Sequence, residues 1–119
     1  MKTIYIIVGV IFFTYISYRT YRFAKLDDGL AEKIQNGAII LDVRTKKEYD
    51  MGHIEGSTNI SLGTIRERYN ELDSNRTYIT TCSHGLRSVK AENILKEKGF
   101  KNVFNGGAWS DLEKIIIDK

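Results

Sequence analysis

The only cysteine of this 119-residue chain lies in a short polar stretch that contains a glycine and an arginine, Thr80-Thr81-Cys82-Ser83-His84-Gly85-Leu86-Arg87-Ser88. β-branched and aromatic residues predict a strand over residues 76–81. Apolar residues at helical spacing, followed by Gly99, predict a helix over residues 88–98. Cys82 would then lie in a strand-to-helix turn, where free backbone N–H groups favour anions and lower the pKa of a thiol. Arg87 would add a fixed positive charge.

A lone cysteine is more often a buried, unreactive apolar residue than a nucleophile. A core cysteine, however, has no need of a polar, glycine-containing turn beside it. The surroundings of Cys82 therefore favour a reactive thiolate.

Four segments, in the same order along the chain, resemble the signatures of single-domain rhodaneses, which are sulfurtransferases. The segments are Ile40-Leu41-Asp42-Val43-Arg44 with Glu48-Tyr49, Gly52-His53-Ile54-Glu55-Gly56-Ser57-Thr58-Asn59-Ile60, Cys82-Ser83-His84-Gly85-Leu86-Arg87-Ser88, and Asn105-Gly106-Gly107-Ala108-Trp109. The third resembles the family's active-site loop, C-x-x-G-x-R-[ST]. The resemblance extends from residue 26 to the C-terminus and implies an α/β domain with a parallel central sheet and helices on both faces.

The resemblance implies that Cys82 and Arg87 are catalytic and that no cofactor is needed. The other loop residues would bind the substrate and the persulfide: Ser83, His84, Gly85, Leu86 and Ser88. Cys82 would take sulfane sulfur from thiosulfate or a persulfide and pass it to a thiol, a cyanide-like acceptor or a protein. Because Arg87 carries the loop's only permanent charge, we expect thiosulfate to be a poor donor.

Two other classes of function use a similar cysteine. Tyrosine phosphatases and arsenate reductases have a larger loop, whereas only four residues separate Cys82 from Arg87 here, which suits a sulfur atom better than a phosphoryl group. A non-enzymatic sulfane-sulfur carrier or a redox-responsive module would use Cys82 without turnover of small molecules.

Neither a metal site nor a nucleic-acid site is expected. One cysteine excludes a cysteine-cluster metal site, and neither His53 nor His84 has a second ligand at metal-binding spacing. Of the 18 Lys and Arg residues, four flank an apolar N-terminal run, which leaves 14 against 15 Asp and Glu in the rest of the chain. Nucleic-acid binding therefore has little support.

The apolar run covers residues 4–18 and is uncharged. Its 15 residues are short against the roughly 20 that span a bilayer, but arginine side chains that snorkel and aromatic residues at the interface can extend it to Ala24. No A-x-A cleavage pattern follows it. We therefore expect a transmembrane helix that anchors the chain over residues 1–25, with membrane contact through residues 4–24, and a separate domain over residues 26–119. A cleaved signal peptide or a buried core helix are the alternatives.

Charges beside the apolar run predict its orientation. Arg19, Arg22 and Lys25 follow it, whereas Lys2 and the amino terminus precede it. Basic residues next to a membrane tend to remain in the cytoplasm, and a free reactive cysteine fits a reducing compartment. We expect a cytoplasmic domain, with a periplasmic or extracellular domain as the alternative.

Apolar runs alternate with helical stretches after residue 26, which predicts an α/β fold with a parallel sheet. Strands are expected at residues 38–43, 58–61, 76–81 and 102–105, and helices at 31–36, 46–51, 64–72, 88–98 and 110–117. Ligands bind beyond the carboxyl ends of parallel strands, so Asp42 and Arg44 are expected near Cys82 in supporting roles.

Asp42 is expected either to orient the active loop or a neighbouring helix, or to cap its own strand. Arg44 and Glu48 are four residues apart, and we expect them to form an ion pair. His53 is expected to bond to local backbone. His84 is expected either to bias the protonation of Cys82 or contact the substrate, or to face solvent.

The last motif, Asn105-Gly106-Gly107-Ala108-Trp109, is expected to have a structural role. Its two glycines permit a tight backbone path, and Trp109 is expected to pack in the core.

Overall fold

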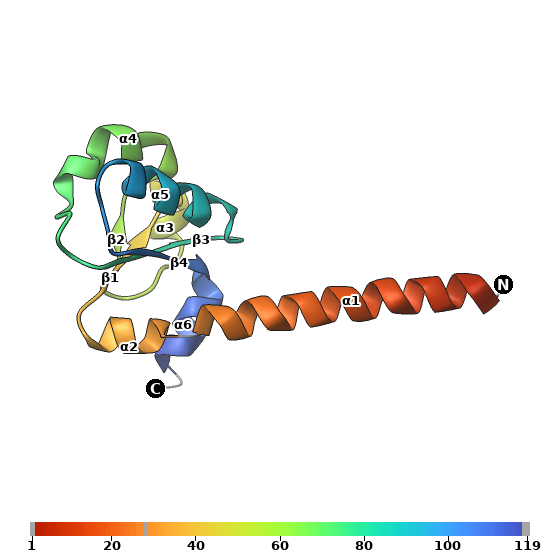
Figure 1. Ribbon diagram of the computed structural model, residues 1–119. Helices are drawn as coiled ribbons and strands as arrows, with labels where there is room; N and C mark the ends of the chain where they lie inside the picture. The colour runs from red at the N-terminus through yellow and green to blue at the C-terminus, as the bar shows by residue number, and fades with distance from the viewer. Residues whose placement is uncertain (1, 28, 118–119) are drawn as a thin grey trace.

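The computed structural model describes residues 2–27 and 29–117, and the side chains of residues 2–20 and 29–117. Four parallel strands form one sheet in the order β2-β1-β3-β4. The strands are β1 (Ile39–Asp42), β2 (Thr58–Asn59), β3 (Tyr78–Cys82) and β4 (Val103–Ala108). The predicted α/β fold with a parallel central sheet is confirmed (Figure 1).

Helices cover both faces of the sheet. The helices of the described residues are α1 (Lys2–Asp27), α2 (Leu30–Gln35), α3 (Lys46–Asp50), α4 (Ile65–Arg68), α5 (Leu86–Glu97) and α6 (Trp109–Ile117), with 3-10 turns η1 (Leu62–Thr64) and η2 (Tyr69–Glu71) on either side of α4. α4 and α5 lie on one face, and α2 and α6 lie on the other (Figure 1). The single helix predicted over residues 64–72 is thus a short α-helix that ends in a 3-10 turn, the tighter geometry that is common at helix ends.

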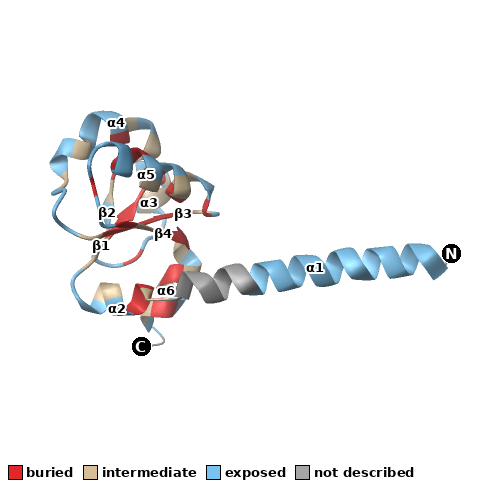
Figure 2. Cartoon of the chain, viewed as in Figure 1, coloured by how far each residue is buried: buried red, intermediate tan, exposed pale blue. Residues whose placement is uncertain are grey.

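Side chains alternate along the strands and divide the core into two clusters. Leu41, Tyr78 and Cys82 pack with the side chains of α4 and α5, whereas Ile40 and Ile79 pack with those of α2 and α6. Buried residues are concentrated along the sheet, between the two helical layers (Figure 2). Cys82 therefore belongs to the face that α5 covers, and the residue is 1% exposed.

β4 is longer than predicted, because it continues through Gly106 and Gly107 to Ala108. Because glycine has a low strand propensity, the sequence did not predict that the strand continues through these residues. A Cβ atom on Gly106 would lie 2.6 Å from Ile79 Cγ2 and 2.9 Å from the carbonyl oxygen of Thr80. The tight backbone path expected for these glycines is confirmed, because only a residue without a side chain fits between β3 and α6.

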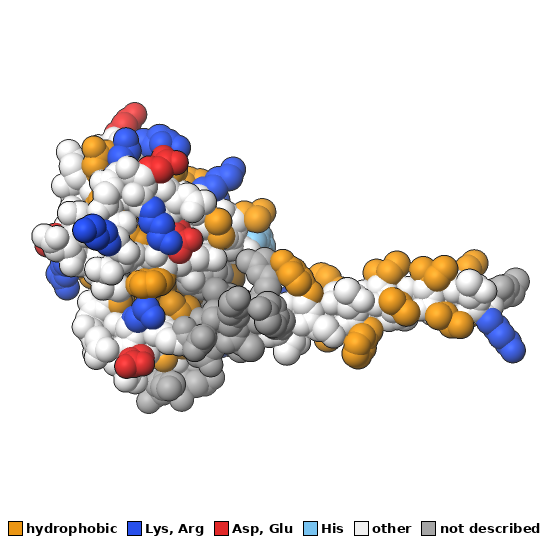
Figure 3. Space-filling model, viewed as in Figure 1, with side chains coloured by type: hydrophobic (Ala, Val, Ile, Leu, Met, Phe, Trp, Pro, Cys, Tyr) orange, Lys and Arg blue, Asp and Glu red, His pale blue; other side chains and the backbone are white. Residues whose placement is uncertain are grey.

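The N-terminal part of α1 projects away from the domain, and the C-terminal end of this helix lies beside α2, α6 and β4 (Figure 1). Its segment Lys2–Thr20 is long and apolar enough to cross a membrane by length and composition, and none of it is buried. Apolar side chains lie along its surface (Figure 3). This exposure fits the anchor or a signal sequence and contradicts the buried core helix. The side chains expected at the membrane interface, in residues 21–25, lie outside the described side chains.

Candidate active site

The turn after β3 forms a cradle of backbone N–H groups around the sulfur of Cys82. α5 begins at Leu86, two residues earlier than predicted, so the turn is only three residues long. Gly85 has a φ of +94°, a conformation that other residues rarely adopt. This turn places the backbone nitrogen of Gly85 3.0 Å and that of Ser88 3.3 Å from Cys82 Sγ.

Two opposing effects act on the Cys82 thiol. Burial raises its pKa, but the polar groups of Ser88 and the N–H groups of Gly85 and His84 outweigh burial, so the pKa is lowered overall. The His84 side chain itself is exposed. This exposure matches the solvent-facing position considered for His84, and contact of its side chain with a substrate stays a prediction.

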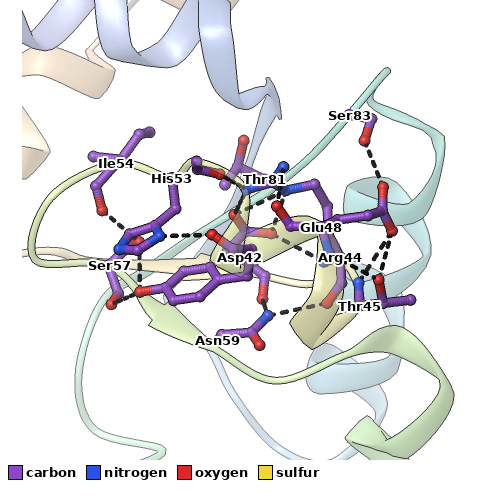
Figure 4. Close-up of polar contacts among 12 residues, drawn as sticks. Asp42, Arg44, Thr45, Glu48, His53, Ile54, Ser57, Asn59, Thr81 and Ser83 are labelled. Atoms are coloured by element: carbon purple, nitrogen blue, oxygen red, sulfur yellow. Dashed lines mark hydrogen bonds and ion pairs between the residues drawn. The ribbon is translucent and has the colours of Figure 1, made fainter.

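The loop's arginine is bound to a carboxylate from α3. Arg87 Nη1 and Nη2 donate to Glu48 Oε1 and Oε2 at 2.7 and 2.9 Å. The hydroxyl of Ser83 donates to Glu48 Oε2 at 3.0 Å (Figure 4). It accepts from Arg87 Nη2, also at 3.0 Å. The Glu48 and Arg87 side chains are 35% and 34% exposed. Their contacts form a clamp, hereafter the Glu48–Arg87 clamp, between the active-site loop and α3.

α3 holds Glu48 in place through a capping box. The N–H of Glu48 donates to Thr45 Oγ1, and the N–H of Thr45 donates to Glu48 Oε1, both at 3.2 Å. Hydrogen bonds from Arg87 first, and then from Thr45 and Ser83, hold the pKa of Glu48 far below its usual range although partial burial opposes them. Glu48 is therefore a fixed negative charge at neutral pH.

The predicted ion pair between Arg44 and Glu48 is wrong. The carboxylate partner of Arg44 is Asp42: Arg44 Nε lies 3.0 Å from both Asp42 oxygens, and Nη2 lies 2.8 Å from Oδ2. Their side chains are only 5% and 1% exposed. Spacing of four residues brings side chains together within a helix, but Arg44 precedes the first residue of α3, Lys46.

Asp42 acts on the neighbouring helix through Arg44. Arg44 Nη1 donates to the carbonyl oxygen of Glu48 at 3.3 Å and Nη2 to that of Gly52 at 2.7 Å, so the pair secures both α3 and the segment that follows it (Figure 4). The guanidinium carbon lies 4.8 Å from the ring centre of Trp109. Of the roles considered for Asp42, these contacts match the orientation of a neighbouring helix.

β4 supports the opposite side of the loop. Asn105 Oδ1 accepts from the Ser88 hydroxyl at 2.6 Å and from the N–H of Gly107 at 2.9 Å. The hydroxyl of Thr81 donates to the carbonyl oxygen of Gly107 at 2.8 Å. Sequence reasoning assigned no role at the site to Asn105 or Thr81, although Asn105 begins one of the quoted motifs.

The remaining motif residues have structural positions. His53 Nδ1 lies 2.7 Å from the carbonyl oxygen of Tyr49, and the two rings are stacked at 3.7 Å, which confirms the expected bond to local backbone. Trp109 is half-buried and packs against the cluster that includes Leu112. Within residues 2–27 and 29–117, no group of three or more His, Cys, Asp and Glu side chains could hold a metal ion.

The parallel sheet and the cysteine loop at its carboxyl edge define a rhodanese-like domain. The family model of that name, the rhodanese-like domain, matches residues 26–110. The chain therefore belongs to the rhodanese-like family.

The chain is similar to several known proteins, and the share of their length that it covers differs from one to another. The chain is 44% identical over 66 residues to YrkF of Bacillus subtilis, whose name describes a sulfur carrier, but the match covers 56% of the chain and only 36% of YrkF. It is 35% identical over 74 residues to the thiosulfate sulfurtransferase PspE of Escherichia coli, which covers 60% of the chain and 71% of PspE. A solved structure described as a rhodanese with anions from E. coli has a TM-score of 0.59 and 34% identity, over 63% of this chain and 91% of that one.

Proposed function

We propose that this chain is a rhodanese-type sulfurtransferase that carries sulfane sulfur as a persulfide on Cys82. The observation that carries the proposal is the cradle at Cys82, where two backbone N–H groups point at a sulfur atom with a lowered pKa. The sulfur-transfer names of YrkF and PspE support the same chemistry.

The reaction consists of two displacements. The Cys82 thiolate attacks the outer sulfur of a donor R–S–SH, so a Cys82 S–S bond forms, the donor S–S bond breaks and the thiolate R–S⁻ leaves. With thiosulfate as donor, sulfite is the leaving group. Cyanide or a thiolate then attacks the outer sulfur of the persulfide, and the electrons of that S–S bond return to Cys82 as a thiolate. N–H groups that point at the sulfur stabilise the anion at each step.

A thiocyanate assay tests this proposal on the full chain, purified in detergent. Thiosulfate or a persulfide is the donor, cyanide is the acceptor, and thiocyanate is measured. Cys82→Ser is expected to abolish turnover while far-UV circular dichroism stays unchanged. Thiocyanate production by Cys82→Ser at the wild-type rate would refute the assignment.

A sulfur carrier without turnover is the second candidate, and the 44% identity to YrkF favours it. Mass spectrometry of protein purified without reductant separates the possibilities. An added mass of about 32 Da on Cys82 corresponds to a persulfide and about 16 Da to oxidation. A persulfide without turnover on small donors supports the carrier, whereas oxidation alone supports a redox-responsive module.

We further propose that α1 anchors the domain to a membrane, with the domain in the cytoplasm. The exposed apolar segment Lys2–Thr20 and the basic residues after it support this arrangement. Retention in the membrane pellet after alkaline carbonate washing is the expected result, and release would contradict an anchor.

To determine on which side of the membrane the domain lies, a thiol reagent needs an accessible cysteine. Cys82 is buried and does not serve this purpose. Lys101 is exposed on the domain surface, so Lys101→Cys in a Cys82→Ser background is suited to an impermeant thiol reagent. A cytoplasmic domain predicts labelling only after the cells are permeabilised. Labelling in intact cells would contradict it.

A further inference from the structure

The positive charge of the active-site loop is already neutralised. Arg87 is the only Lys or Arg in the loop, and its guanidinium is bound through two nitrogens by Glu48 in the Glu48–Arg87 clamp. Arg44, which precedes α3, is buried and paired with Asp42. When Cys82 is a thiolate, Glu48, Arg87 and Cys82 together carry one net negative charge.

A site with this charge disfavours a dianion. Thiosulfate would bring two negative charges to a thiolate, and the cation that could offset them is occupied by Glu48. A persulfide or another donor with a single charge meets about half of that repulsion, because Coulomb energy scales with the product of the charges. The side chains of the Glu48–Arg87 clamp are about two-thirds buried, so solvent screens this difference only in part.

We propose that Glu48 determines donor specificity: by occupying Arg87, it selects sulfane donors with one negative charge or none against dianions such as thiosulfate. The proposal rests on the sulfurtransferase function proposed above and deepens it. It assigns persulfides and related monoanions as the substrate class of the Cys82 site.

Glu48 also has a structural role, since it belongs to the capping box of α3. Glutamine supports the same box as well as glutamate does. Glu48→Gln therefore removes the negative charge while it keeps the helix cap, and it leaves Arg87 with its positive charge unmatched. A purely structural role would change the rates with all donors by the same factor.

The test compares two donors with the same kind of reactive S–S bond and different charge. Thiosulfate is a dianion, and methanethiosulfonate is a monoanion that releases methanesulfinate when the Cys82 thiolate takes its outer sulfur. Cyanide is the acceptor in both assays, and kcat/KM is measured from thiocyanate. Glu48→Gln is expected to raise the ratio of thiosulfate to methanethiosulfonate kcat/KM about tenfold, which corresponds to about 1.4 kcal/mol. The increase in kcat/KM for thiosulfate is expected to come mainly from a lower KM.

Asp50→Asn is the matched control, because Asp50 lies on the same helix and pairs with Lys46 at the surface. It changes the net charge equally and is expected to leave the ratio within about twofold of the wild-type value, since its pair is solvent-screened. A second measurement needs no variant: raising the ionic strength should increase kcat/KM of the wild type more for thiosulfate than for methanethiosulfonate, because salt screens a repulsion. A decrease with salt would overturn the proposal.

The outcomes separate this inference from the proposed function. If the wild type makes no thiocyanate from either donor, the sulfurtransferase proposal fails. If the wild type is active and Glu48→Gln leaves the ratio unchanged, or lowers both rates equally, only the role of Glu48 in specificity is refuted. If Glu48→Gln does not fold, the salt dependence of the wild type decides.

Discussion

Replacement of Asp42 by asparagine tests the buried ion pair beneath the candidate active site. Asparagine would keep the size of the side chain but would carry no charge, and its NH₂ group would face an N–H group of Arg44. Arg44 is 4% exposed, and its positive charge would no longer be matched by a carboxylate. We therefore expect Asp42→Asn to be strongly destabilising.

The magnitude follows from burial and from the contacts that remain. Removal of one partner from a buried ion pair costs about 3–5 kcal/mol. Arg44 would still donate to the carbonyl oxygens of Glu48 and Gly52 and lie against Trp109, so we expect the lower end, about 3 kcal/mol. That cost is a large part of the roughly 5–15 kcal/mol by which small domains are stable.

Urea unfolding of the full chain in detergent measures this cost. Trp109 is the only tryptophan and lies over Arg44, so its fluorescence reports on this region directly. With a slope of about 1.5 kcal/mol per molar urea, the midpoint is expected to fall by about 2 M.

Asp50→Asn is the control, because the Lys46–Asp50 pair is exposed at 82% and 57% and should contribute less than about 1 kcal/mol. The double change Asp42→Leu with Arg44→Met, which removes both charges, is expected to recover part of the loss. If Asp42→Asn cost no more than Asp50→Asn, the buried pair would not be the element that stabilises this edge of the sheet.

Three further predictions concern the loop and its supports. Gly106→Ala is expected to destabilise the fold by about 1–3 kcal/mol, because its Cβ would lie 2.6 Å from Ile79 Cγ2 and 2.9 Å from backbone; Gly63→Ala, with nothing within 4 Å, should have little effect in the same urea titration. Ser88→Ala is expected to raise the pKa of Cys82, because the Ser88 side chain helps to lower that pKa, so the ultraviolet absorbance of the thiolate, taken as the difference from Cys82→Ser, should appear at higher pH; a titration that stays in place would contradict this. The pKa of Glu48 is lowered by folding, so its stabilisation is present above its unfolded pKa and is lost as the pH falls below about 4.5. Glu48→Gln should therefore show a smaller loss of unfolding free energy in acid, by less than about 1 kcal/mol because the pair is partly exposed, and an unchanged acid dependence would refute this assignment.

Local sequence predicted the turn at Cys82 well. The strand before Cys82 and the helix after it were both predicted, with the helix start two residues late. Their signals are local: β-branched residues for the strand, helical spacing for the helix, and a glycine at each turn. Gly99, for example, has a φ of +96° just after the end of α5, where a glycine stop was predicted.

The partner of Arg87 could not be predicted in the same way. Glu48 and Arg87 are 39 residues apart in the chain, and nothing in the local pattern connects them. The spacing rule for helices instead suggested Arg44 as the partner of Glu48, whereas Arg44 turns back to Asp42, two residues before it.

Neighbouring residues and regular periods were enough to predict the strand-to-helix turn at Cys82, the α/β fold class and the apolar N-terminal helix. The pairing of charged side chains, in contrast, is determined only by the tertiary structure. Parallel strands bring distant segments together at one edge of the sheet, so the carboxylate that neutralises Arg87 comes from α3 and the support of Ser88 comes from β4. Burial then fixes these pairs, because a charge removed from water requires a partner within hydrogen-bonding distance.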